Sequence, residues 1–122
     1  MKSTVSPKPA EIDRHWYLVD AAGVPVGRLS STIAKLILGK GKSFWAPHVD
    51  CGDFVIVVNA DQAVLTGAKE RAKVYYRHTT QKPGSLKSPA AFEVREKHPA
   101  RLVESAVFGM LPKTKLGRKL RK

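Results

Sequence analysis

Residues 53–59 are the stretch that most constrains the fold, because almost every position in Asp53-Phe54-Val55-Ile56-Val57-Val58-Asn59 is apolar. The segment is short and rich in β-branched residues, which predicts a strand. Its apolar residues do not alternate with polar ones. A strand that is buried on both faces has this pattern, and such strands are typical of a sheet with helices on each side.

Helical and extended patterns alternate along the rest of the chain. Residues 16–20 predict a strand, and Leu29, Ile33 and Ile37 share one face of a helix predicted over residues 27–38. We further expect weaker strands over residues 63–66 and 73–78, a loop over 79–89, a short helix over 90–97, and a helix that begins at Pro99 and ends near Gly109 and Pro112. Strand–helix–strand order with a buried strand predicts an α/β fold with a mainly parallel sheet.

The length of 122 residues suits one compact domain. We divide it into an N-terminal extended arm at residues 1–15, a core at 16–112 and a basic tail at 113–122.

A lone cysteine, Cys51, cannot form an internal disulfide and suits a reducing compartment. No apolar run approaches the roughly 20 residues of a membrane span, and no secretory signal is visible. We therefore expect a soluble cytoplasmic protein or the mature form of an organellar one.

Charge is the unusual part of the composition. The chain has 22 Lys+Arg against 10 Asp+Glu, a net charge of +12. Such an excess repels itself unless a polyanion neutralises it, and nucleic acid is the commonest polyanion in a cell. A membrane surface is the second candidate partner, and solubility alone is the third explanation.

The cations gather in three runs that turns separate. The first run comprises Lys35, Lys40 and Lys42; the second comprises Lys69, Arg71, Lys73, Arg77, Lys82 and Lys87, opposed only by Glu70; the third comprises Lys113, Lys115, Arg118, Lys119, Arg121 and Lys122. Lysine and arginine contacts with phosphates would give sequence-independent, salt-dependent affinity. A basic tail of this kind often stays disordered until RNA neutralises it.

Two places could bind an anion or a base, and each has a plainer alternative. The helix start at Gly27, with Arg28 beside it, favours a phosphate through its unpaired amides, although an ordinary strand–helix turn explains it equally well. Phe44 and Trp45 could stack on a base, but Trp45 is more often a packing residue. No RNP1, KH or zinc-finger motif is evident, so we expect binding to RNA shape and backbone.

Enzymatic and metal-binding motifs are incomplete. Gly41-Lys42-Ser43 supplies half of a phosphate-binding loop, but Leu36 stands where its first glycine belongs. His48, Asp50 and Cys51 lie close together without a second ligand cluster. We favour a structured turn there, with Asp50 or Asp53 capping local amides. We expect no catalytic residue, metal or cofactor, and we expect His15, His78 and His98 to be surface or hydrogen-bonded histidines.

Several segments together resemble the ribosomal protein L13 family. They occur in the order of the family over residues 16–118: Trp16-Tyr17-Leu18-Val19-Asp20, Gly27-Arg28-Leu29, Pro47-His48-Val49-Asp50, Gly52-Asp53, Val58-Asn59-Ala60, Lys73-Val74-Tyr75-Tyr76-Arg77-His78-Thr79, Gly109-Met110-Leu111-Pro112-Lys113 and Leu116-Gly117-Arg118. The resemblance implies a three-layer α/β/α fold around a parallel sheet of four strands. It implies a structural protein that binds large-subunit ribosomal RNA early in assembly, among other large-subunit ribosomal proteins, without a membrane or a small-molecule substrate.

The resemblance and the basic runs together give the expected RNA contacts. These are Arg28, Lys40, Lys42, Lys69, Lys73, Arg77, His78, Lys113, Lys115, Arg118, Lys119 and Arg121. Two departures from the family pattern stand out. The pattern usually continues past Leu116-Gly117-Arg118 into a further helical, basic segment, so a truncated form is one expectation. Cys51 occupies a position where bacterial members commonly have a small hydroxyl residue. Both bacterial and organellar members fit.

The alternatives are a nucleotide-binding enzyme on a Rossmann-like sheet and a protein that binds membranes or nucleic acids without selectivity. The enzyme would require a phosphate-binding fingerprint, which is not intact in this sequence. The unselective binder would take anionic vesicles, DNA and RNA alike.

Overall fold

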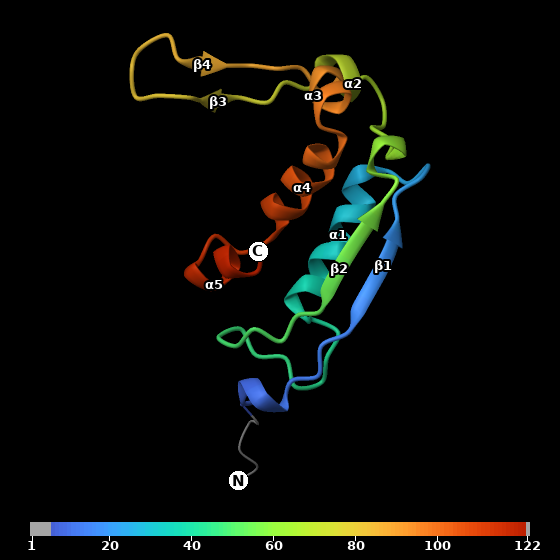
Figure 1. The fold of residues 1–122 in the computed structure, drawn as a ribbon, viewed down its shortest axis with the longest axis vertical. Coiled ribbons are helices and arrows are strands. Elements are labelled where there is room, and N and C mark those ends of the chain that lie inside the picture. Colours follow the sequence, from blue (N-terminus) through green and yellow to red (C-terminus); the bar gives the residue numbers. More distant parts are fainter. Residues whose placement is uncertain (1–5, 122) are drawn as a thin grey trace.

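A βαβ unit forms the centre of the fold in the computed structural model, which describes residues 6–121 (Figure 1). Strands β1 (Trp16–Asp20) and β2 (Phe54–Val58) pair in parallel, and helix α1 (Val26–Leu38) lies between them in the chain. All three elements agree with the sequence prediction to within one residue at each end. The fold is mixed α/β, as expected.

The two faces of the β1–β2 sheet differ in burial. Val19 and Val57 pack against the core, whereas the side chains of Leu18 and Ile56 are 72% and 48% exposed. Neighbouring residues on a strand point to opposite faces, so the core covers only one face. The prediction that residues 53–59 are buried on both faces is therefore wrong within the described part of the chain.

The predicted four-stranded parallel sheet is replaced by two sheets of two strands each in the described residues. Residues 63–66 add a single parallel bridge, between Val64 and Pro25. Residues 73–78 do not pair with the first sheet. Instead, the last two of them form β3 (Arg77–His78), which pairs with β4 (Leu86–Lys87) in an antiparallel hairpin. The three-layer arrangement is thus corrected to helices on one face of a small sheet, with a separate hairpin.

Helix α4 (Pro99–Met110) packs along α1 and closes the core. Leu102, Val103 and Val107 are buried on its inner face, and Leu29 and Ile33 are buried on α1. The helix begins at a proline and ends just before Leu111, as predicted. Two short helices precede it, α2 (Lys69–Ala72) and α3 (Ala91–Lys97).

Two glycines join the end of α1 to the entry of β2 by direct backbone contact. Gly39 ends the helix with a positive φ of 70°, and its amide donates to the Leu36 carbonyl. A Cβ at Gly39 would overlap the Cys51 carbonyl, and a Cβ at Gly52 would overlap the Ile37 carbonyl. No side chain fits between these two segments.

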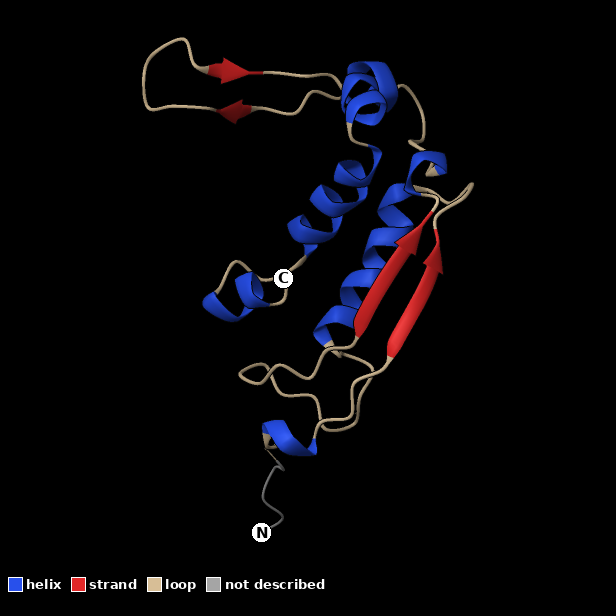
Figure 2. Cartoon of the chain, in the orientation of Figure 1, coloured by secondary structure: helices blue, strands red, loops and turns tan. Residues whose placement is uncertain are grey.

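The β3–β4 hairpin and helix α5 (Lys115–Lys119) both project from the body, with α4 between them (Figure 2). Residues 115–119 of the predicted basic tail are thus helical. Thr114 begins α5 with its hydroxyl accepting a hydrogen bond from the Gly117 amide at 3.2 Å. None of the helices within residues 6–121 combines the length and apolar character that crossing a membrane requires.

The N-terminal arm contains one turn of 3-10 helix, Pro9–Glu11, and residues 1–5 lie outside the described part of the chain. The arm contacts the loop before β2 at several points. Ser6 Oγ and His48 Nε2 form a hydrogen bond of 3.0 Å, and Arg14 pairs with the Asp50 carboxylate at 3.0 Å. The division into arm, core and tail stays a prediction.

Candidate nucleic-acid interface

Ion pairs distinguish the cations that hold the fold from those that face solvent. Within residues 6–121, the lysines and arginines that pair with a carboxylate are Arg14, Lys42 and Arg95. The other described lysines and arginines form no ion pair with a carboxylate of residues 6–121. The excess positive charge is therefore available to a partner and is not absorbed by the fold.

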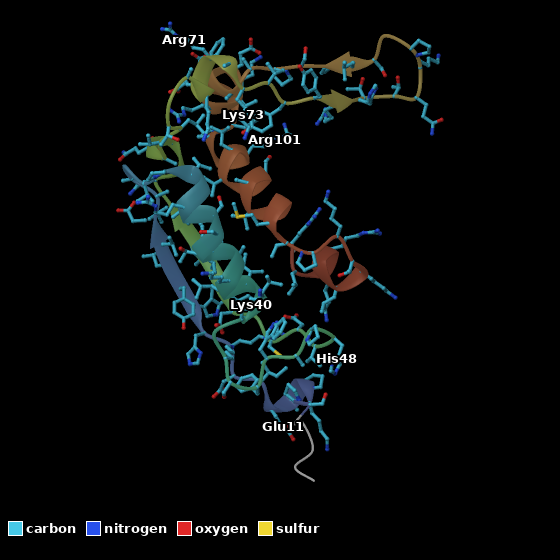
Figure 3. The ribbon with its side chains drawn as sticks, turned by 180° about the vertical axis from the view of Figure 1, so that it is seen from behind. Glu11, Lys40, His48, Arg71, Lys73 and Arg101 are labelled. Carbon is cyan, nitrogen blue, oxygen red and sulfur yellow. The ribbon has the colours of Figure 1, made fainter. Side chains whose placement is uncertain are left out.

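The hairpin end of the molecule carries the first group of free cations. Lys69 lies on α2, Lys73 follows it, and Arg77 and His78 form β3, all with exposed side chains. No acidic residue occurs in the sequence between Glu70 and Glu93. Figure 3 shows the labelled side chains of Arg71, Lys73 and Arg101 at this same end of the molecule.

A hollow of about 820 Å³ opens between this hairpin and the helices α3 and α4, and we name it the hairpin hollow. Its lining includes Tyr75, Tyr76, Arg77, Lys87, Lys97 and Arg101. Lys97 and Arg101 are not among the contacts predicted from the sequence. In the sequence they are two cations four residues apart with Pro99 between them, a spacing that predicts no site. They line the same hollow because α3 ends and α4 begins beside it.

Helix α5 carries the second group. Lys113, Lys115, Arg118, Lys119 and Arg121 are all exposed, and no acidic residue follows Glu104 in the sequence. Arg121 Nη2 donates to the Phe108 carbonyl at 3.1 Å, and the guanidinium lies 5.5 Å from the centre of the Phe108 ring. These contacts hold the segment after α5 against α4, so the group has a defined position.

Arg28 and Lys40 belong to neither group, because they lie at opposite ends of α1. Arg28 lies in the first turn, and Lys40 comes two positions after the last helical residue, Leu38. The ten helical steps from Arg28 to Leu38, at about 1.5 Å each, span roughly 15 Å. Both side chains are exposed. Apart from Lys42, the predicted contacts thus divide into two dense groups and two single positions.

Lys42 differs from the other predicted contacts because its ammonium already has partners. Its Nζ lies 2.6 Å from Asp53 Oδ1 and 2.6 Å from the Asp13 carbonyl oxygen, and its side chain is 16% exposed. Burial raises the pKa of the Asp53 carboxyl. The His15 amide and the Lys42 ammonium outweigh that effect, so the net pKa lies below its ordinary value.

The loop that joins α1 to β2 is a structured turn, as predicted. Asp50 Oδ1 accepts from the Gly52 amide at 3.3 Å, and Asp53 Oδ1 accepts from the His15 amide at 3.0 Å.

Trp45 is half-buried and lines an apolar groove of about 360 Å³ together with residues of α5, which favours packing over base stacking. Across residues 6–121, no three His, Cys, Asp or Glu side chains are placed to hold a metal ion.

Comparison with known sequences assigns the chain to a family. A profile of ribosomal protein L13 matches residues 14–122. The chain belongs to the ribosomal protein L13 family. The L13 protein of Halorhodospira halophila, a large ribosomal subunit protein uL13, is 55% identical over 119 residues, which is 98% of this chain and 83% of that relative.

Other L13 relatives show a similar match over nearly the whole chain. The large ribosomal subunit protein uL13 of Geobacillus thermodenitrificans is 52% identical over 98% of this chain and 82% of its own length. That of Pediococcus pentosaceus is 51% identical over 98% and 80%, respectively. The resemblance found in the sequence is confirmed, and the L13 family is one of ribosomal proteins and not of enzymes.

Proposed function

We propose that this chain is a structural constituent of the large ribosomal subunit and that it binds large-subunit ribosomal RNA. Its relatives carry the name large ribosomal subunit protein uL13. The observation that carries the RNA-binding part is the charge separation. The hairpin and α5 project from the body with many free cations and without a single carboxylate of their own.

The proposed RNA contacts are the predicted cations that remain free of ion pairs. They are Arg28, Lys40, Lys69, Lys73, Arg77, Lys113, Lys115, Arg118, Lys119 and Arg121, together with His78. Each contact with a phosphate releases counterions, so affinity rises as salt falls. We assign Lys42 to the fold, because RNA would have to compete with Asp53 for its ammonium.

The proposed mechanism is architectural. The α1–α4 core is a rigid mount, and α4 separates the hairpin group from the α5 group (Figure 1). Two separate basic surfaces can neutralise two RNA segments that would otherwise repel each other. This lowers the free-energy cost of bringing the segments together early in subunit assembly, next to other large-subunit proteins, in the cytoplasm or in an organellar matrix or stroma.

Competition binding tests the proposal. Labelled large-subunit ribosomal RNA is bound to the whole chain while unlabelled ribosomal RNA, unrelated RNA of equal length, and anionic vesicles compete across a salt series. We expect ribosomal RNA to compete best and to keep its advantage at high salt. Equal competition by all polyanions, abolished by salt, would leave only a general polyanion binder. Saturable stabilisation by a nucleotide would instead support the enzyme alternative.

A further inference from the structure

We propose that the hairpin hollow binds unstacked nucleotides of an RNA strand, so that the chain prefers RNA with a bulge or loop over a continuous duplex. The inference rests on the proposed RNA-binding function and names the kind of RNA that one part of the surface takes. It differs from the expectation that binding depends on RNA shape and backbone alone.

The cross-strand pairing of the hairpin places two cations directly opposite each other. Arg77 on β3 is the pairing partner of Lys87 on β4, and both side chains line the hollow. Like charges at directly opposed positions destabilise a hairpin. Neither residue forms an ion pair with any described carboxylate. An anion bound between the two side chains would remove the repulsion, and a phosphate of an RNA strand has the required charge.

The opposite wall of the hollow is also basic. Lys97 at the end of α3 and Arg101 in the first turn of α4 line it, and both are exposed. Glu93 is the one carboxylate in the lining that the structure describes. The hollow therefore presents cations from two sides, which suits a strand whose backbone passes between the hairpin and the helices.

Tyr75 and Tyr76 give the hollow aromatic surface between these cations. Tyr76 is 71% exposed, so its ring is accessible to a partner. Tyr75 is held in place, because its amide donates to the Pro89 carbonyl at 2.9 Å and the Lys73 ammonium lies 5.0 Å from the centre of its ring. Exposed aromatic rings among cations are the usual platform for single-stranded nucleic acid.

The dimensions of the hollow suit single nucleotides better than a continuous double helix. The volume of about 820 Å³ lies within the range of about 300–1,000 Å³ of pockets that enclose small ligands. Bases in a duplex stay paired and stacked, so a base reaches such a hollow only from a bulge, a loop or an end. An acidic protein segment would satisfy the cations but would offer no base to stack on the two tyrosines.

Two RNAs test the inference: a fluorescently labelled duplex, and the same duplex with a bulge of unpaired nucleotides. The whole chain binds both in a salt series, followed by anisotropy. We expect the bulged RNA to bind about tenfold more tightly. Tyr76→Ala should remove most of that advantage and Tyr76→Phe should keep it, because phenylalanine retains the ring. Lys87→Ala should reduce the salt slope for the bulged RNA by about 0.7.

Lys115→Ala on α5 is the matched control, and it should weaken both RNAs by the same factor. Circular dichroism verifies that each variant folds. Equal affinity for the two RNAs, or equal loss of both in Tyr76→Ala, would overturn the inference while leaving the proposed function intact. Displacement of the bulged RNA by polyglutamate at equal charge would assign the hollow to acidic protein segments. Failure to bind either RNA would reject the proposed function itself.

Discussion

The ammonium of Lys42 lies 2.6 Å from Oδ1 of Asp53, and the same carboxylate oxygen accepts a hydrogen bond from the amide of His15. One carboxylate thus joins the loop after α1, the entry to β2 and the N-terminal arm. The pair lies in a basic loop, yet its role is to hold three segments together.

Lys42→Ala should therefore lower the free energy of unfolding and leave the salt slope of RNA binding unchanged. Removing one partner of a largely buried pair leaves the other uncompensated, so we expect the free energy of unfolding to fall by about 3 kcal/mol. Lys40→Ala, two residues away and exposed, should leave stability unchanged and reduce the salt slope of RNA binding. Urea unfolding and RNA titration of both variants measure the difference. Equal salt slopes in the two variants would contradict this division of roles.

Stability should fall in acid because the pKa of Asp53 is lowered in the folded chain. The ionised carboxylate stabilises the fold above its ordinary pKa of 3.8, and this contribution is lost as the pH falls through the lower folded value. Asp53→Asn should be less stable at neutral pH and should show a flatter stability profile below about pH 4. Thermal unfolding from pH 7 to pH 2 tests this, with the exposed Asp61→Asn as control. Parallel profiles for the wild type and Asp53→Asn would refute it.

Gly117→Ala should detach α5 from the body. A Cβ at this position would overlap the Pro112 carbonyl, and backbone offers little room to move. The nearby Gly109→Ala meets nothing within 4 Å and lies inside α4, where alanine favours the helix by up to about 1 kcal/mol. We expect faster amide exchange over residues 113–121 in Gly117→Ala and normal exchange in Gly109→Ala. Unchanged exchange in Gly117→Ala would show that the contact can relax.

Arg95 should contribute to stability and not to RNA binding. Its guanidinium bonds Glu70 Oε1 at 2.7 Å and the Ala63 carbonyl at 2.8 Å, so it links α3 to α2 and to the chain after β2. Arg95→Ala should cost about 2 kcal/mol, since it leaves a carbonyl and a carboxylate without a partner. The salt slope of RNA binding should stay the same. A reduced slope would place Arg95 among the RNA contacts.

Local sequence pattern was sufficient for the elements whose residues contact their own neighbours in the chain. The bounds of α1 and α4 follow from helical spacing, Gly39 and Pro99. The pattern did not predict burial or strand pairing that depends on residues distant in the sequence. The apolar run of β2 does not reveal that Ile56 lies on an uncovered face, and Leu86 joins a strand only because residue 78 lies opposite it.

The candidate interface divides in the same way. The runs of lysine and arginine could be identified in the sequence, and most of their described members are exposed and form no ion pair with a described carboxylate. The runs could not reveal that Lys42 is taken by Asp53, because the loop that brings the two together must first be folded. Nor could they join Arg77 to Arg101, which lie 24 residues apart and share the hairpin hollow.

The backbone contact of Gly39 and Gly52 also limits how the sequence can vary. Because main-chain atoms set the closest approach between the end of α1 and the segment before β2, the exposed Lys40 in the loop between them can be exchanged without shifting either element, whereas Lys42 is fixed by its ion pair with Asp53. Any side chain at the two glycines would push the helix away from the strand. The charge of the loop can therefore vary at Lys40, while Gly39 and Gly52 at its base must each keep a hydrogen atom in place of a side chain.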